Sequence, residues 1–385
     1  MDARTGDWAG VRLLDRAALR HVPHWQNAFE GKRKDHRYYE ILEDTIAGYD
    51  YRYFVIGDDN GNARAVQPAF LLDQDLVAGV NHGAAAFVGA IRRVWPRFLM
   101  LRTLMVGCVA GEGHLDGPAE EHAGRARALA EAIVPEARRL KAPLVVLKEF
   151  PACHRSDLAS FLGAGFARIP SMPMTKVDIG YASFDDYMAK ALNGATRRKL
   201  RKKFKKAADA SPITMSVTSD VSDIVGEIYP LYLAVYDRSK LHFEKLTEAF
   251  FRDIGRRMPD IVRFFVWRQE GRIVACTLCM LEGENFFAEY VALDYRVALD
   301  LHLWHYVVRD MTSWAIANGF RWFRSSGLNY DPKLHLRHQL DPIDLYVRHT
   351  SGVANALLKR ILPLVEPTRF DKTLKKFANY ADLWN

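Results

Sequence analysis

The stretch Val262–Ser325 reads VRFFVWRQEGRIVACTLCMLEGENFFAEYVALDYRVALDLHLWHYVVRDMTSWAIANGFRWFRS. It opens with three apolar runs that are rich in aromatic and β-branched residues and separated by short turns that contain glycine, which predicts three strands. The next run, Leu299–Asn318, predicts a helix that Gly319 closes as its C-cap. A fourth strand, Phe320–Ser325, completes the unit. The first three predicted strands are Val262–Arg268, Arg272–Leu281 and Phe286–Leu293.

A related order extends along the rest of the 385 residues, a length that suggests two domains or one large one. A strand at Ile213–Thr218 and two helices precede the quoted stretch, and a similar but weaker order, with a helix at Gly83–Trp95, runs through residues 50–180. We therefore predict an α/β fold of two tandem mixed-sheet modules, joined by a basic helix and followed by a helical tail. The predicted limits are 1–182 for the first module, 183–210 for the linking helix, 211–350 for the second module and 351–385 for the tail.

The predicted linking helix carries an excess of basic residues comparable to the whole net charge. The chain has 54 Lys and Arg against 46 Asp and Glu, a formal charge of +8, and Arg197–Lys206 alone holds eight basic residues in ten. A capping box at Ser183–Asp186 and an apolar stripe at multiples of four predict one helix over residues 184–208. Such local charge indicates an anionic ligand or membrane surface, an RNA such as charged tRNA, or only a solvated face. The residues predicted to form an anion-binding surface are Arg197, Arg198, Lys202, Lys203 and Lys206.

Composition and motifs exclude several classes of protein. Hydrophobic residues make up 49% and charged residues 26%, which is typical of packed globular chains. The longest uncharged apolar runs, 83–91 and 273–281, are far shorter than the roughly 20 residues that span a bilayer. Because no secretion signal is found either, we expect a cytoplasmic protein that can bind peripherally to the inner face of the membrane. The sequence contains no P-loop, GxGxxG, HExxH or GxSxG motif, so the commonest nucleotide, zinc-protease and hydrolase signatures are missing.

Two short patterns resemble metal motifs but favour a different interpretation. Cys276 and Cys279 have CxxC spacing within a predicted strand, where residues three apart face opposite sides of a sheet. We therefore predict two small core residues there. His335 and His338 have HxxH spacing without a third ligand nearby. We predict no metal site from the sequence.

Seven stretches, taken in their order along the chain, have the pattern of one known family: Ser183–Lys206, Phe250–Asp253, Arg257–Asp260, Leu301–Trp304, Ala315–Phe320, Gly327 with Lys333-Leu334, and Tyr346–His349. Together they resemble the GNAT acyltransferase fold, in the branch that holds Fem-type peptidoglycan ligases and FemAB-like proteins. Two departures stand out: Trp304 replaces the family's Glu after "LHF", and Arg296–Leu301 occupies the place of the glycine-rich pyrophosphate loop.

This resemblance implies that the second module transfers an acyl group to an amine. The donor would be acyl-CoA or an acyl carrier protein, used as a co-substrate, with no permanently bound cofactor. The basic helix and the amphipathic tail Val353–Val365 favour a long-chain or lipid amine as the acceptor, such as a sphingoid base. Acylation of a sphingoid base is the reaction of bacterial ceramide synthases. One alternative is a Fem-like transferase that takes aminoacyl groups from tRNA to a peptidoglycan precursor. Another is a non-catalytic protein that binds envelope lipid or glycan.

The same resemblance and the predicted elements point to candidate catalytic residues. His302, predicted one turn into the helix, can act as a general base or orient the amine, and His305 lies one turn further on. Each of these histidines can also be an ordinary helix residue. Glu289 lies in an apolar strand that borders the thioester in GNAT folds, so it is either a base or one partner of a structural salt bridge.

Further residues are candidates for binding the two substrates. The acyl donor would lie along the predicted strand Phe286–Leu293 and the start of the predicted helix Leu299–Asn318. Lys333 follows the carboxyl end of a strand, where α/β folds place ligands, and can hold an anionic head group or phosphate. The predicted donor-binding residues are Val291, Leu293, Leu299 and Leu301, and the predicted substrate-binding residues are Tyr330, Lys333 and Tyr236.

Overall fold

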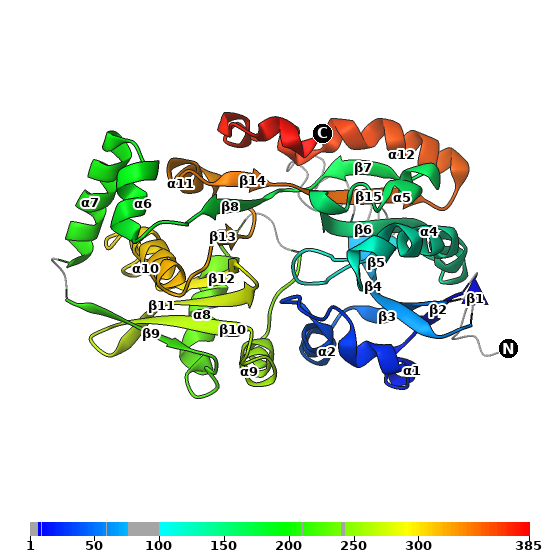
Figure 1. The fold of residues 1–385 in the computed structure, drawn as a ribbon, viewed down its shortest axis with the longest axis horizontal. Helices are drawn as coiled ribbons and strands as arrows, with labels where there is room; N and C mark the ends of the chain where they lie inside the picture. The colour runs from blue at the N-terminus through cyan, green and yellow to red at the C-terminus, as the bar shows by residue number, and fades with distance from the viewer. Residues whose placement is uncertain (1–6, 9, 59, 76–99, 209–210, 240–242) are drawn as a thin grey trace, which may run out of the picture.

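The structure is a computed structural model and describes residues 7–8, 10–58, 60–75, 100–208, 211–239 and 243–385. The chain forms two lobes that lie side by side, each built around one mixed β-sheet (Figure 1). Within the described residues the first sheet has eight strands and the second has seven, which confirms the predicted α/β fold of two mixed-sheet modules. The helix predicted at residues 83–95 lies outside the described residues.

The first sheet belongs to the lobe that contains the N-terminus (Figure 1). Neighbouring strands in it are antiparallel, except for β5 and β6, which are parallel. In spatial order its strands are β1 (Asp7–Trp8), β2 (Val11–Leu14), β3 (Asp50–Gly57), β4 (Ala63–Asp75), β5 (Met100–Val106), β6 (Leu144–Pro151), β15 (Ile343–His349) and β7 (Ala167–Pro170).

The second sheet repeats this plan. Its one parallel pair is β12 and β13, and the other neighbours are antiparallel. In spatial order its strands are β14 (Gln339–Asp341), β8 (Met174–Asp178), β13 (Trp322–Ser325), β12 (Asn285–Leu293), β11 (Arg272–Glu282), β10 (Val262–Gln269) and β9 (Ile213–Thr218).

One strand of each predicted module lies in the sheet of the other module. β8 follows β7 in the chain, yet it lies in the second sheet between β13 and β14. In return β15, the last strand, lies in the first sheet between β6 and β7 (Figure 1). The predicted limits at residues 182 and 211 therefore divide the chain but do not divide the sheets.

Helices cover both sheets and meet between the lobes. α4 packs on the first sheet and α12 on its exchanged strand, while α8 and α10 pack on opposite faces of the second sheet. α2 packs against α9 where the lobes join. The helices are α1 (Arg16–Leu19), α2 (His36–Thr45), α4 (His122–Arg139), α5 (Ala159–Gly163), α6 (Phe184–Ala191), α7 (Gly194–Ala208), α8 (Val225–Tyr236), α9 (Glu248–Arg257), α10 (Leu303–Ala317), α11 (Tyr330–His335) and α12 (Gly352–Val365), and short 3₁₀ turns follow α12.

Strand alternation distributes the apolar residues between separate cores. In β10, Phe264 belongs to a core cluster that both lobes share, whereas its neighbour Phe265 belongs to the cluster beneath α10. Cys276 and Cys279 divide between the same two clusters, and both are free thiols. The prediction that they are core residues on opposite faces of a strand is confirmed.

Two helix predictions need correction. The linking helix is not continuous, because it breaks after Ala191 and restarts as α7, where the Asn193 side chain accepts a hydrogen bond from the Thr196 amide at 2.8 Å. The central helix begins at Leu303 and not at Leu299, because the preceding residues form turns held by the carbonyl of Asp294. No helix in the described ranges is both long and apolar enough to cross a bilayer.

Candidate active site

A wedge opens in the second sheet where its two parallel strands separate. β12 and β13 pair from Asn285 and Trp322 as far as Ala288 and Ser325, and β12 then runs on to Leu293. No strand pairing is found on the β13 side of this last part of β12 in the described structure. Backbone N–H and C=O groups along that edge are therefore available to a ligand.

Glu289 lies at the start of this wedge in a β-bulge. Leu278 of β11 pairs with Tyr290, while the next residue, Cys279, pairs with Ala288, so Glu289 is the extra residue. Such bulges bend a strand and redirect its side chains, often beside active sites.

A cavity of about 780 Å³ occupies the wedge. Its wall combines the free part of β12 with the inner face of α10 and with the residues that follow β13, and it is mainly apolar. Its lining includes Glu289, Tyr290, Val291, Leu293, Trp304, Val307, Val308, Met311, Ser326, Lys333 and His338. Its size and lining are typical of a site for a small-molecule ligand.

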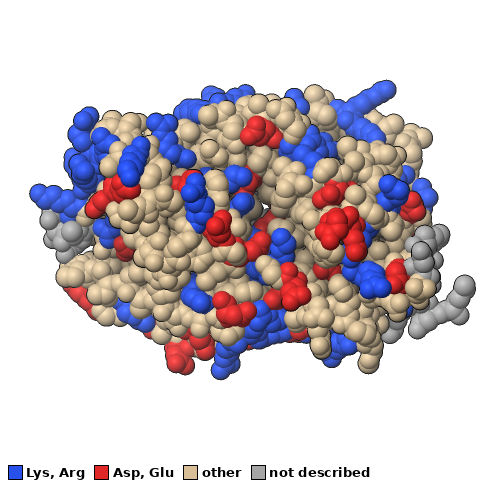
Figure 2. All heavy atoms as spheres, viewed as in Figure 1, with Lys and Arg blue, Asp and Glu red and all other residues tan. Residues whose placement is uncertain are grey.

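A second chamber of about 520 Å³ adjoins the first. Both are lined by Glu289, Tyr290 and Val291, so these residues of β12 lie where the chambers meet. The smaller chamber reaches into the first lobe and is rich in carboxylates (Figure 2 shows the hollow between the lobes). Its charged lining residues are Glu112, Lys148, Glu149, Glu244 and Glu289.

A buried ionic cluster supports the junction from the first lobe. Arg33 is 1% exposed, and its Nε donates to Oε1 of Glu289 at 2.8 Å. Its guanidinium also pairs with Glu112, whose second oxygen accepts from Lys34 Nζ at 2.7 Å. Burial alone would lower the pKa of Arg33, but the surrounding carboxylates outweigh it and raise that pKa. Burial would likewise raise the pKa of Glu112, but the two cations hold it well below the usual carboxyl range.

Glu244 differs from these paired carboxylates. Its Oε1 accepts a hydrogen bond from the Tyr290 hydroxyl at 2.8 Å, and no ion pair to it is found within the described residues. Loss of hydration raises the pKa of Glu244, although Lys148 opposes the shift. Lys148 itself donates to Glu149 at 2.6 Å and to the Gly111 carbonyl at 2.9 Å. Glu244 is therefore a stronger proton acceptor than an ordinary glutamate.

The larger chamber contains two basic groups whose charged forms are disfavoured. Lys333 is 7% exposed, and burial lowers its pKa to about 7. Its Nζ donates to the Ser326 carbonyl at 2.6 Å. Burial, with Lys333 nearby, lowers the pKa of His338 to about 3, and its Nδ1 atom has no hydrogen-bond partner in the described structure.

The predicted binding residues divide between the chambers and other places. Val291, Leu293 and Lys333 line the larger chamber, and Tyr236 lines the smaller one. The other three do not line either chamber. Leu299 is 75% exposed, Leu301 is buried, and Tyr330 packs in a core where its hydroxyl donates to the Pro173 carbonyl at 2.8 Å.

The two predicted catalytic histidines lie outside both chambers. His302 is the N-cap of α10 with a left-handed backbone (φ 49°), so it is not one turn inside the helix. It lines a separate pocket of about 520 Å³ formed with five lysines, the lysine pocket. His305 Nε2 lies 2.8 Å from Lys203 Nζ, and burial with this charge lowers the pKa of His305 to about 4. The members of the lysine pocket are Lys199, Lys202, Lys203, Lys205, Lys206 and His302.

The predicted anion-binding surface is only partly assembled. Lys202, Lys203 and Lys206 lie together in the lysine pocket, and Figure 2 shows basic side chains gathered over α6 and α7 at the upper left. Arg197 instead donates to the carbonyls of Ala189 and Leu192 at the end of α6. Arg198 is exposed and does not line that pocket.

The site residues that come from the first lobe and from the segment after α8 were not predicted from the sequence. Arg33, Glu112, Lys148 and Glu244 belong to four separate segments, and none lies within a recognisable motif. The one available signal was their charge next to apolar stretches, since charged residues in such places are usually paired or functional.

Comparisons with known proteins agree with this geometry. Residues 194–333 match the family described as the acetyltransferase (GNAT) domain. No curated protein sequence matches the chain. The fold is similar to that of FemX, with a TM-score of 0.54 and 12% identity over 92% of this chain and 99% of FemX. It is also similar to L-PGS from Bacillus licheniformis, with a TM-score of 0.50 and 12% identity over 86% of this chain and 96% of L-PGS. The segment from α7 to α11 thus matches a GNAT acetyltransferase domain, and it lies within a fold of two tandem modules.

Proposed function

We propose that the chain transfers an acyl group from acyl-CoA to an amine. The observation that carries this proposal is the wedge of β12 and β13, which connects a mainly apolar chamber with a carboxylate-rich one at Glu289. An uncharged acyl thioester suits the first chamber, and a cationic amine suits the second. The two substrates would then meet at the residues common to both.

The free edge of β12 would bind the donor. The pantetheine arm of acyl-CoA is an extended chain with two amides, and it can pair with an open strand edge as an added strand does. The phosphates of CoA would lie in the lysine pocket, because His302 borders that pocket while Trp304, two residues further, lines the larger chamber. The first turn of α10 therefore separates the lysine pocket from the larger chamber. Lysine ammonium groups would bind the phosphates there in place of the backbone N–H groups of a glycine-rich loop.

The smaller chamber would bind and activate the amine. Glu289, paired with Arg33, would position it, and Glu244 would accept its proton because the pKa of Glu244 is raised. The amine nitrogen then attacks the thioester carbonyl, an amide N–H of the free β12 edge stabilises the oxyanion, and the C–S bond breaks. The nitrogen of the intermediate loses its second proton, which reaches the leaving thiolate of CoA through solvent, so an amide and free CoA are formed.

A lipid amine is the acceptor class that we propose. In α12, Val353, Leu357, Ile361 and Leu364 are 42–85% exposed and follow helical spacing, which places an apolar stripe on the surface. Lys359 and Arg360 are exposed beside it. An amphipathic helix with flanking cations favours peripheral binding to an anionic bilayer, where a long-chain amine would be found.

The test is an assay of the purified chain with acyl-CoA of several chain lengths and two amines. One amine is a long-chain sphingoid base in vesicles, and the other is a short soluble amine. Release of free thiol and the mass of the amide product report transfer. We expect amide formation with the sphingoid base and much less with the short amine. Thiol release that does not depend on any amine would contradict the proposal.

Transfer of an aminoacyl group from tRNA is the second candidate. The lysine pocket and the rest of α7 favour it, because tRNA phosphates would find the same charges that CoA phosphates would. The same assay distinguishes the two donors when charged tRNA replaces acyl-CoA. Amide formation from charged tRNA alone would establish this candidate and exclude the first.

A further inference from the structure

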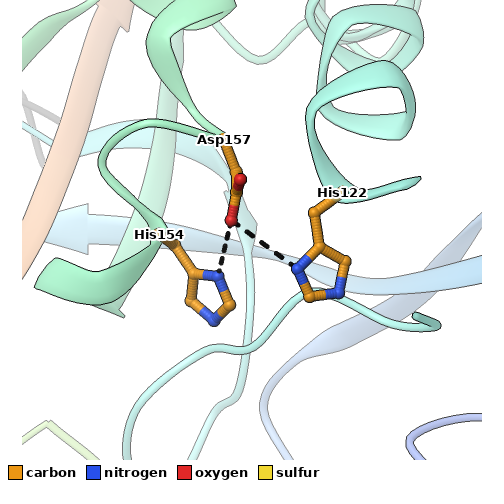
Figure 3. Close-up of side chains that lie close together, drawn as sticks. All are labelled: His122, His154 and Asp157. Atoms are coloured by element: carbon orange, nitrogen blue, oxygen red, sulfur yellow. Dashed lines mark hydrogen bonds and ion pairs between the residues drawn. The ribbon is translucent and has the colours of Figure 1, made fainter. Parts of the chain in front are cut away.

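A second cluster of polar side chains lies in the first lobe, apart from both chambers. His122 begins α4, His154 lies in the 3₁₀ turn after β6, and Asp157 precedes α5. Asp157 Oδ2 lies 3.3 Å from Nδ1 of His154 and 3.6 Å from Nδ1 of His122 (Figure 3). One ligand atom from each of the three residues can be chosen so that all lie within 4.8 Å of one another.

The other nitrogen of His122 fixes the proton on that ring. Its Nε2 lies 2.9 Å from the Gly117 carbonyl, and because a carbonyl only accepts, Nε2 must carry a proton. In the neutral ring Nδ1 is therefore unprotonated, and its lone pair faces the negative oxygen of Asp157. These two groups repel each other unless Nδ1 takes up a proton or a metal cation lies between them. A histidine whose second nitrogen donates to a backbone carbonyl is also the usual arrangement around a bound metal.

The spacing fits a small transition-metal ion. Zinc binds histidine nitrogen and carboxylate oxygen at roughly 2.0–2.1 Å, so tetrahedral ligand atoms lie about 3.3 Å apart. The two measured separations from Asp157 Oδ2, 3.3 and 3.6 Å, are close to that value. The side chains of His122, His154 and Asp157 are 7%, 12% and 23% exposed, which leaves one side of the cluster open to water.

We propose that Nδ1 of His122, Nδ1 of His154 and Oδ2 of Asp157 bind one divalent transition-metal ion, with water as a fourth ligand. Two imidazoles and one carboxylate favour zinc over magnesium or calcium, which prefer oxygen ligands. The ion would join the start of α4 to the turn before α5, two elements that pack together. The spacing of these residues in the sequence did not predict the site, since His122 and His154 lie far apart in the chain.

The test is zinc binding by the full chain, purified without a histidine tag and stripped of metal with a chelator. Competition with a chromophoric chelator gives the affinity, and elemental analysis gives the stoichiometry. We expect one zinc ion per chain, a more than about tenfold loss of affinity in Asp157→Asn and in His122→Ala, and unchanged affinity in His335→Ala. Cys153→Ser is a matched control, because Cys153 is an exposed thiol next to His154. Loss of binding in that variant would overturn the assignment.

Cobalt serves as a second probe that needs no variant. Bound by these three residues and water, Co²⁺ would show the strong visible absorption of a tetrahedral nitrogen and oxygen site. Zinc would raise the melting temperature of the original chain but not that of Asp157→Asn, since a ligand that binds only the folded state stabilises it. No zinc uptake by the original chain would overturn the proposal and leave a proton on His122 to balance Asp157. Equal uptake by all variants would also overturn it.

Discussion

Arg33 Nε donates to Glu289 Oε1 at 2.8 Å and so joins a segment near the beginning of the chain to the central strand of the second sheet. The guanidinium also lies 3.5 Å from the centre of the Phe287 ring. Arginine suits this place because its fixed donors reach several carboxylates at once and its flat face stacks on an aromatic ring. The first lobe thus contributes directly to the site of the second.

Replacing Arg33 with Met is expected to destabilise the chain strongly. The variant leaves buried carboxylates without their main counter-charge, a change that typically costs about 3–5 kcal/mol. Urea unfolding of the variant measures the loss. Arg64→Met is the control, because Arg64 is 60% exposed in its pair with Asp58 and should contribute little. Equal stability of the two variants would contradict the role given to Arg33.

Glu244→Gln and Glu289→Gln are expected to affect different kinetic constants. Loss of a general base typically lowers kcat about 100-fold or more, so Glu244→Gln should lower kcat and remove the acid limb of its pH profile. In the original chain this limb should lie at a pH above the pKa of an ordinary glutamate, because the pKa of Glu244 is raised. Glu289→Gln should mainly raise KM for the amine. If only Glu289→Gln changes the pH profile, the two roles are exchanged.

Burial of Lys333 is expected to make stability depend on pH in the alkaline range. Its pKa falls from 10.5 to about 7 on folding, so between these values the unfolded chain binds a proton that the folded chain does not. Stability from this group therefore rises with pH from about 7 to 10.5 and does not change below that window. Lys333→Met should thus gain stability relative to the original chain at neutral pH and lose that advantage near pH 10.5. Urea midpoints across the window would show it, and a constant difference would contradict it.

Removal of charge from α7 separates the possible anionic partners. Replacing Lys202, Lys203, Lys205 and Lys206 with Gln keeps helix propensity while it removes four charges from the lysine pocket. We expect a higher KM for acyl-CoA and weaker sedimentation with anionic vesicles. Added salt should reduce both differences from the original chain, because it screens the lysine charges. Gln at Lys372, Lys375 and Lys376, exposed lysines of the tail, is the control. Unchanged KM with loss of tRNA binding would indicate the tRNA-dependent reaction instead.

Sequence patterns predicted where the strands lie in the chain better than they predicted which strands pair. The strands Val262–Gln269, Arg272–Glu282 and Asn285–Leu293 follow directly from apolar runs and glycine turns, which are local signals. The placement of β8 in the second sheet and of β15 in the first has no such signal, because a short apolar strand has the same composition in either sheet. Pairing between distant segments depends on the whole fold.

The same distinction applies to the site. Val291, Leu293 and Lys333 could be placed near a ligand because they follow the order of the elements in one module. Arg33 and Glu244 could not be placed there from the sequence, because only folding brings their segments next to β12. His302 was misplaced because its left-handed conformation delays the start of α10, and the sequence there contains no glycine that would mark such a turn.

The way in which the chain crosses between the sheets limits how the two lobes can move. It passes from the first sheet to the second through residues 171–173, between β7 and β8, and returns through Pro342 alone, between β14 and β15. Because these two links are so short, a wide hinge opening would pull on the strands at both ends of each link, so we expect the lobes to behave as one stiff body. Substrates would then enter through small movements of loops and side chains at the rim, and a polypeptide cut between the modules would yield two halves that each lack an interior strand.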